Sequence, residues 1–229
     1  MWSSRLFIIG SWVVFGNLVV LPSTFAYEAI VETIPVPYEV VQLVGDTQTS
    51  KVVLGELQDA PEMFELVIDA TSTLALEVRA IPTGNTQPIF SGIIIKQKAI
   101  RGIEEVARMS ATDATWDRLV DSSTGLPYLA GPYFSETVTP GTYRIEVSNA
   151  NNQGKYLLVL GSGDDDQSYV ESLRAVMITY EFYGTSKLKL FNSPYVHYPV
   201  GILLGLLVMS VTVYKNRHRF VTPTPINHA

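Results

Sequence analysis

The residues best suited to binding a ligand lie between Thr112 and Tyr128. Asp113, Asp117 and Asp121 could supply carboxylate oxygens to Ca²⁺, which prefers oxygen ligands. Trp116 and Tyr128 could stack on a sugar ring. The segment reads as a long connection between strands, and such connections on a rigid scaffold commonly carry binding residues. It therefore predicts a ligand site, one form of which is a calcium-dependent, lectin-like glycan-binding domain.

The same residues also fit a purely structural role. Trp116 is more often a core anchor, and Asp121-Ser-Ser-Thr-Gly125 is typical of a solvated turn. The acidic run Asp164–Asp166 lacks the alternating ligand spacing and closing glutamate of a calcium loop, so it predicts a linker. We expect no cofactor and no metal, with Ca²⁺ as the alternative.

Catalysis in this region would depend on carboxylates. The chain has no cysteine, and its three histidines are His197, His218 and His228. Ser-His-Asp, Cys-His and histidine-zinc chemistry are therefore excluded between residues 27 and 193. Glu104 with Glu105, or Asp117 with Asp121, could serve a hydrolase, but adjacent residues on a strand point to opposite faces. We expect a non-enzymatic protein, with a carboxylate-based hydrolase as an alternative.

The charges are divided along the chain. All 22 acidic residues lie between Tyr27 and Pro194, together with 12 of the 16 lysines and arginines. This net acidity argues against a nucleic-acid-binding protein. The remaining basic residues are Arg5, Lys215, Arg217 and Arg219, which flank the two apolar ends of the chain and are typical orientation signals.

Two apolar segments predict export and anchoring. Met1 to Ala26 has a short basic start, an apolar run and a small-residue ending, the layout of a cleaved signal peptide. Pro194 to Tyr214 has no charged side chain and is long enough to span a bilayer. The basic residues after it predict a single-pass, type I protein with the tail in the cytoplasm. Gly201 and Gly205 form a GxxxG element, which favours a homodimer through this helix.

Between these ends the sequence predicts strands and turns. Apolar and polar residues alternate over Phe64–Ile68 and Leu74–Ala80, the period of half-buried strands. Pro140-Gly141 and the polar run Asn149–Gly154 predict a hairpin. The predicted fold is an all-β, antiparallel β-sandwich or jelly roll, followed by an amphipathic helix over Gln167–Tyr183 that either packs on the sandwich or lies along the membrane.

The segment Val138-Thr-Pro-Gly-Thr-Tyr-Arg-Ile-Glu-Val147, with Gly154-Lys-Tyr-Leu-Leu-Val-Leu160 after it, resembles the end of bacterial pre-peptidase C-terminal domains. Met63–Ile68 and Leu74–Val78 are similar to the opening strands of that family. The resemblance implies a small jelly roll with an accessory binding or stabilising role, and it transfers no active site.

The predicted organisation has six parts. They are a signal peptide (1–26), a lead-in (27–37), the sandwich ectodomain (38–161), an acidic linker and juxtamembrane helix (162–193), the transmembrane helix (194–214) and a cytoplasmic tail (215–229). The expected function is a membrane-anchored extracytoplasmic binding or accessory module for a protein or glycan partner. The lack of cysteine and of Asn-x-Ser/Thr acceptors favours a prokaryotic cell surface.

Overall fold

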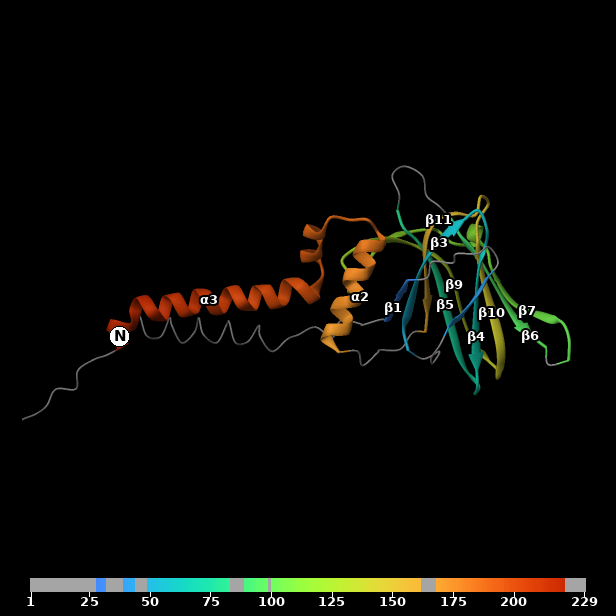
Figure 1. Ribbon diagram of the computed structural model, residues 1–229, viewed down its shortest axis with the longest axis horizontal. Coiled ribbons are helices and arrows are strands. Elements are labelled where there is room, and N and C mark those ends of the chain that lie inside the picture. The colour runs from blue at the N-terminus through green and yellow to red at the C-terminus, as the bar shows by residue number, and fades with distance from the viewer. Residues whose placement is uncertain are drawn as a thin grey trace, which may run out of the picture. The chain divides into compact units, whose positions relative to one another are not determined.

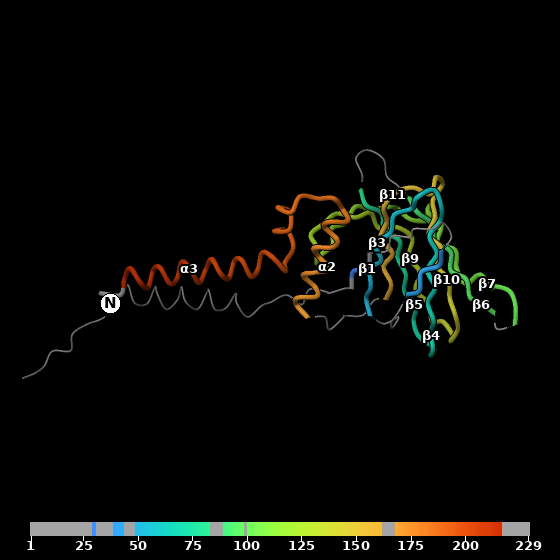
Figure 2. Tube along the Cα trace, viewed as in Figure 1, coloured from blue at the N-terminus to red at the C-terminus, as the bar shows by residue number. Residues whose placement is uncertain are grey.

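The computed structural model describes residues 28–31, 39–43, 49–82, 89–98, 100–161 and 168–220. The predicted signal peptide and the acidic run at 164–166 lie outside these residues. The chain divides into two compact units, and Tyr195 is the last residue of the larger one. Figure 1 shows the strands gathered in this larger unit, and Figure 2 shows the same path as a trace.

The larger unit is a sandwich of two β-sheets. Within the described residues, the first sheet has the order β1-β3-β11-β5-β9-β8 and the second has the order β2-β4-β10-β6-β7. The strands of the first sheet are β1 (Glu28–Val31), β3 (Lys51–Gln58), β5 (Ser72–Ala80), β8 (Arg118–Val120), β9 (Pro127–Val138) and β11 (Gln153–Leu160). Those of the second are β2 (Val40–Leu43), β4 (Glu62–Ile68), β6 (Ser91–Gln97), β7 (Ile103–Met109) and β10 (Gly141–Ser148). The predicted all-β sandwich is confirmed.

Two strand pairs differ from the predicted antiparallel pattern. β1 pairs with β3 in parallel, and so does β2 with β4. The reason lies in the order of the chain, which alternates between the sheets from β1 to β4. A strand that returns to its own sheet after a crossover can run parallel to the strand it left, whereas a tight turn allows only an antiparallel pair. Both sheets are therefore mixed.

The predicted hairpin near the end of the sandwich is wrong. β10 pairs with β4 and β6 in the second sheet, whereas β11 pairs with β3 and β5 in the first. The polar turn between them is present: the Asn149 side chain accepts from the backbone of Asn151 at 3.1 Å and donates to the carbonyl of Gln153 at 2.8 Å. This turn carries the chain from one sheet to the other.

The core lies between the sheets and follows the predicted two-residue period. On β5 the side chains of Leu76, Val78 and Ala80 are fully buried, and on β10 those of Tyr143, Ile145 and Val147 face them. One ionisable pair is enclosed with them. The Tyr156 hydroxyl donates to the buried carboxylate of Glu62, and burial raises the pKa of Tyr156 well above its ordinary value.

Helix α2 (Tyr169–Phe182) packs on the first sheet, one of the two alternatives that the sequence left open. Ser168 caps its N-terminus in a capping box with Glu171. Ile178, Phe182 and Tyr183 join an apolar cluster with Val52, Leu54, Ile81 and Leu157 on the outer face of that sheet. The Lys155 ammonium on β11 donates to the carbonyl of Phe182 at 2.8 Å. α2 also contacts β1, so it covers this face of the first sheet (Figure 1).

The C-terminal helix α3 (Pro194–Phe220) follows the short 3-10 helix η2 (Lys187–Asn192). Residues Pro194–Asn216 are long and apolar enough to cross a membrane, and an 18-residue window within them has a mean hydropathy of 1.9. This agrees with the predicted span of 194–214. Gly201 and Gly205 both lie on α3, and a Cβ added at either would meet nothing within 4 Å. The predicted homodimer through these glycines stays a prediction.

Candidate functional site

Trp116 lies in the core, the structural role that the sequence offered as its alternative. Its side chain is 7% exposed and belongs to the main apolar cluster. The indole N–H donates to the carbonyl of Ala111 at 2.8 Å, which satisfies the polar edge of the ring. The ring therefore packs inside the sandwich and offers no face on which a sugar could stack.

Gly131 on β9 makes room for this indole. A Cβ at Gly131 would lie 2.0 Å from the carbonyl oxygen of Val78 and 2.6 Å from the indole Cη2. Trp116 itself has a φ of 56°, in the left-handed region that non-glycine residues seldom adopt. Tight packing against Gly131 and the bond to Ala111 hold it there. The indole thus fixes the chain between η1 (Ala111–Asp113) and β8.

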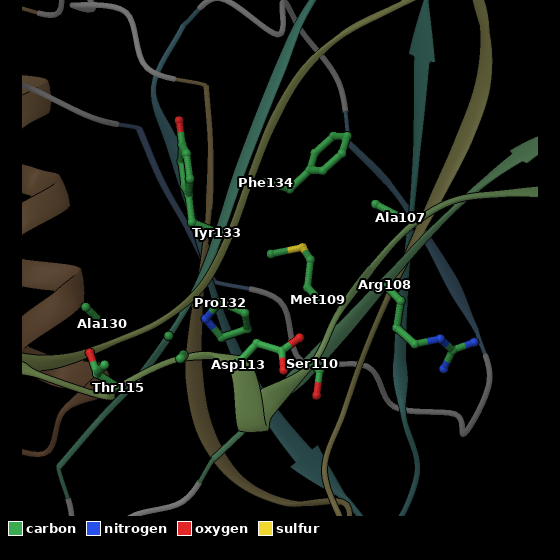
Figure 3. A pocket seen from close by; sticks show the side chains of 12 residues that line it. Ala107, Arg108, Met109, Ser110, Asp113, Thr115, Ala130, Pro132, Tyr133 and Phe134 are labelled. Atoms are coloured by element: carbon green, nitrogen blue, oxygen red, sulfur yellow. The ribbon is translucent and has the colours of Figure 1, made fainter.

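A pocket of about 400 Å³ opens beside this anchor, where the edge strand β7 of the second sheet meets β9 of the first (Figure 3). Its apolar lining comes from Met109, Phe134, Pro132 and three small residues, Ala107, Ala114 and Ala130. Figure 3 shows the Met109 thioether between Phe134 and Pro132, with Asp113 and Ser110 together at one side. An apolar pocket with a few polar groups is the usual form of a small binding site.

The polar groups of the pocket differ in the hydrogen bonds that they already make within the protein. The Arg108 guanidinium donates to both carboxylate oxygens of Glu105, at 2.9 and 3.2 Å, and this hydrogen bond raises the pKa of Arg108. The Asp113 carboxylate is exposed and accepts a long 3.4 Å bond from the Thr112 hydroxyl. Asp113 is therefore the group in the pocket best placed to receive an incoming donor.

Asp117 and Asp121 lie in other surroundings. Asp117 is exposed and accepts from the Thr115 hydroxyl at 2.7 Å. One carboxylate oxygen of Asp121 accepts from the backbone N–H groups of Ser123 and Thr124, at 3.0 and 2.7 Å, and from the Thr124 hydroxyl at 2.9 Å. Asp121 thus organises its own turn, as its Ser-Ser-Thr-Gly sequence suggests.

Tyr128 and Asp121 meet around Arg79, a residue that the sequence analysis did not select. The Arg79 guanidinium carbon lies 4.3 Å from the centre of the Tyr128 ring. Its terminal nitrogens lie 2.7 Å from Glu77 and 4.0 Å from Asp121. Burial raises the pKa of Tyr128, although the positive charge of Arg79 opposes the change. The alternation of β5 places Arg79 on the outer face, but only the fold shows that Tyr128 and Asp121 lie beside it.

The five predicted site residues therefore lie in four places: Asp113 in the pocket, Trp116 in the core, Asp117 beside Thr115, and Asp121 with Tyr128 beside Arg79. Among the residues that the structure describes, no group of three or more acidic or histidine side chains could hold a metal ion. Arg108 and Met109 on β7 and Phe134 on β9 complete the pocket, and no local sequence signal marks them because the two strands are distant in the sequence.

No family model and no curated protein matches the sequence. Among solved structures, the chain is similar to the pre-peptidase C-terminal domain of collagenase from Bacillus anthracis, with a TM-score of 0.35, 10% identity, and coverage of 56% of this chain and 98% of that one. It is also similar to PliG of Aeromonas hydrophila, a periplasmic inhibitor of g-type lysozyme, with a TM-score of 0.35, 12% identity, and coverage of 59% and 98%. The first is a domain of the family that Val138–Leu160 resembles.

Proposed function

We propose that this chain is a membrane-anchored, non-enzymatic binding or accessory module that presents its sandwich outside the cytoplasm to a protein or glycan partner. The observation that carries the proposal is the pocket between β7 and β9, with its apolar lining and the accessible carboxylate of Asp113. Its size fits one or two side chains or a single sugar unit.

The chemistry of the pocket favours a basic protein loop over a glycan. Met109, Phe134 and Pro132 suit an aliphatic stem, and Asp113 suits a cationic end. The residues between Tyr27 and Pro194 hold all the acidic residues of the chain, so long-range attraction would also favour a basic partner.

The membrane anchor rests on the apolar span Pro194–Asn216. We expect type I orientation, because Lys215, Arg217 and Arg219 follow the span and no acidic residue follows Glu181. Protease added to intact cells should then remove the sandwich and spare the tail. We also expect the mature chain to begin near Tyr27, and N-terminal sequencing checks this.

A photo-cross-linking amino acid placed at the pocket tests the binding role directly. In native membranes, a cross-linker at Thr115 should capture a specific partner, whereas one at Thr137, on β9 but outside the pocket, should not. Asp113→Lys should abolish the capture, and Asp69→Lys, an equal charge change at another exposed position, should leave it intact. Equal capture at both positions, or equal loss in both variants, would exclude the pocket as the binding site.

A further inference from the structure

The short helix η2 exposes an unusual combination of side chains just before the candidate membrane span. Leu188 is 78% exposed and Phe191 is 51% exposed. Lys187 and Lys189 are exposed as well. No acidic residue follows Glu181 anywhere in the chain, so no carboxylate on this segment offsets the two lysines.

This segment is held firmly by the sandwich. The Tyr180 hydroxyl lies 2.6 Å from the carbonyl of Lys189, and the Ser193 hydroxyl donates to the carbonyl of Ser123 at 2.7 Å. Leu126, Val176, Tyr180 and Tyr195 form an apolar cluster that Leu190 joins. Gly125 also lies close to the end of η2, because a Cβ at Gly125 would lie 2.8 Å from the carbonyl oxygen of Asn192. One side of η2 therefore contacts the sandwich, through the partly buried Leu190, while Leu188 and Phe191 are exposed.

The chain continues from η2 directly into the candidate span. Pro194 begins the span and is separated from η2 only by Ser193. Even a fully extended chain covers only about 10 Å over three residues, so Phe191 must lie within that distance of the point where the chain enters a bilayer. The position of η2 near the membrane thus follows from chain connectivity and rests on the proposed anchor.

We propose that η2 is a lipid-binding element: Leu188 and Phe191 insert into the membrane interface, and Lys187 and Lys189 contact anionic lipid phosphates. Apolar side chains flanked by lysines are the composition that binds the boundary between headgroups and acyl chains. The lysine stems can extend along the apolar surface while their ammonium groups remain among the phosphates. Because η2 is fastened to the sandwich, its insertion orients the sandwich on the membrane.

The lack of cysteine makes this testable in the full chain. Leu188→Cys and Phe191→Cys, each labelled with an environment-sensitive fluorophore, would be reconstituted into vesicles of phosphatidylcholine and phosphatidylglycerol. Ile100→Cys is the matched control, because Ile100 is 94% exposed on the loop between β6 and β7. Leu204→Cys on α3 reports on the anchor itself. Brominated lipids then reveal which fluorophores contact acyl chains.

We expect blue-shifted emission and quenching by brominated lipid at positions 188, 191 and 204, and neither effect at position 100. Quenching at 204 with water-like emission at 188 and 191 would overturn this proposal and leave the anchor intact. Absence of quenching at 204 would overturn the anchor and this proposal together. A blue shift at 188 and 191 without quenching would show a protein contact, such as a second copy of the chain, and would also overturn it.

The lysines are tested with the fluorophore at position 191. Replacing phosphatidylglycerol by phosphatidylcholine should reduce the quenching, and Lys187→Gln with Lys189→Gln should remove this dependence on anionic lipid. The control pair is Lys98→Gln with Arg101→Gln on the exposed loop between β6 and β7, which removes the same charge and should leave the dependence unchanged. An equal effect of both pairs would show that net charge, and not η2, attracts the lipid.

Discussion

The Tyr180 hydroxyl fastens η2 to the sandwich, and replacing Tyr180 measures how much free energy this contact contributes. Tyr180 is 2% exposed, and its hydroxyl lies 2.8 Å from the carbonyl of Thr124 and 2.6 Å from that of Lys189. These two carbonyls belong to the β8–β9 turn and to η2. Tyr180→Phe keeps the ring in place, so it creates almost no cavity and removes only the donor.

The free-energy cost of Tyr180→Phe depends on the two carbonyl groups that lose the hydroxyl donor. A typical hydrogen bond contributes about 1 kcal/mol, whereas a buried polar group left without a partner costs about 1 to 3 kcal/mol. We therefore expect Tyr180→Phe to lower the free energy of opening of this segment by about 1 to 3 kcal/mol, which corresponds to roughly 5- to 150-fold faster amide exchange. In global unfolding, the same change would lower the midpoint by roughly 2 to 10 °C.

Hydrogen exchange of the full chain, analysed by peptide, separates the local effect from the global one. Exchange should accelerate in α2, in η2 and in residues 121–126, and change little in β4 and β10. Tyr133→Phe is the matched control, because Tyr133 is 61% exposed and the same loss of a hydroxyl occurs there at the surface. Unchanged exchange in α2 and η2 would refute the inference that this hydroxyl fastens the segment.

Three further predictions concern the sandwich itself. Gly131→Ala should destabilise it by at least about 2 kcal/mol in denaturant unfolding, because the new Cβ would lie 2.0 Å from the Val78 carbonyl oxygen. Hydrogen bonds from Gln42 and, to a smaller extent, from Arg144 lower the pKa of Glu65. The stability that these bonds provide should therefore be lost as pH falls below about 4. Glu65→Gln should reduce the dependence of the thermal midpoint on pH in this acidic range. The thermal midpoint should be the same with added calcium as with a chelator. A midpoint that is much higher with calcium would favour the lectin-like alternative.

The strands were predictable because their signal is local. Alternation over Leu74–Ala80 arises from burial of one face of β5, and burial of every second residue is visible in any sequence that forms such a strand. The candidate span was predictable for the same reason, since its apolar length is a property of consecutive residues. These signals specify a sandwich and a helix, but they leave open which strands are neighbours.

The pairing of strands was less predictable, as β10 and β11 show. A turn rich in asparagine and glycine reverses the chain equally well within one sheet and between two sheets. What decides the outcome is the set of neighbours, β4 and β6 for one strand and β3 and β5 for the other. The pocket could not be predicted from the sequence for the same reason: Met109 and Phe134 come together only when β7 of one sheet meets β9 of the other.

The connection from Thr112 to Tyr128, which holds the five predicted site residues, has a different role at each of its ends. Its beginning, at Asp113 and Thr115, lines the pocket. Its end, the turn from Asp121 to Leu126, receives α2 and η2 through the carbonyls of Ser123 and Thr124. Trp116 in the core and the pairing of β8 with β9 separate these ends. Substitutions at the two ends should therefore have different effects.

Asp121→Ala tests this separation. It removes the acceptor for the N–H groups of Ser123 and Thr124 and for the Thr124 hydroxyl, which we expect to cost about 1 to 3 kcal/mol of stability. The pocket does not include Asp121, so capture of a partner by a cross-linker at Thr115 should persist while the protein is folded. Asp113→Lys should do the reverse, with an unchanged thermal midpoint and no capture. If Asp121→Ala abolished capture without lowering the midpoint, Asp121 would contact the partner itself, and the division of this connection into a binding end and a docking end would be wrong.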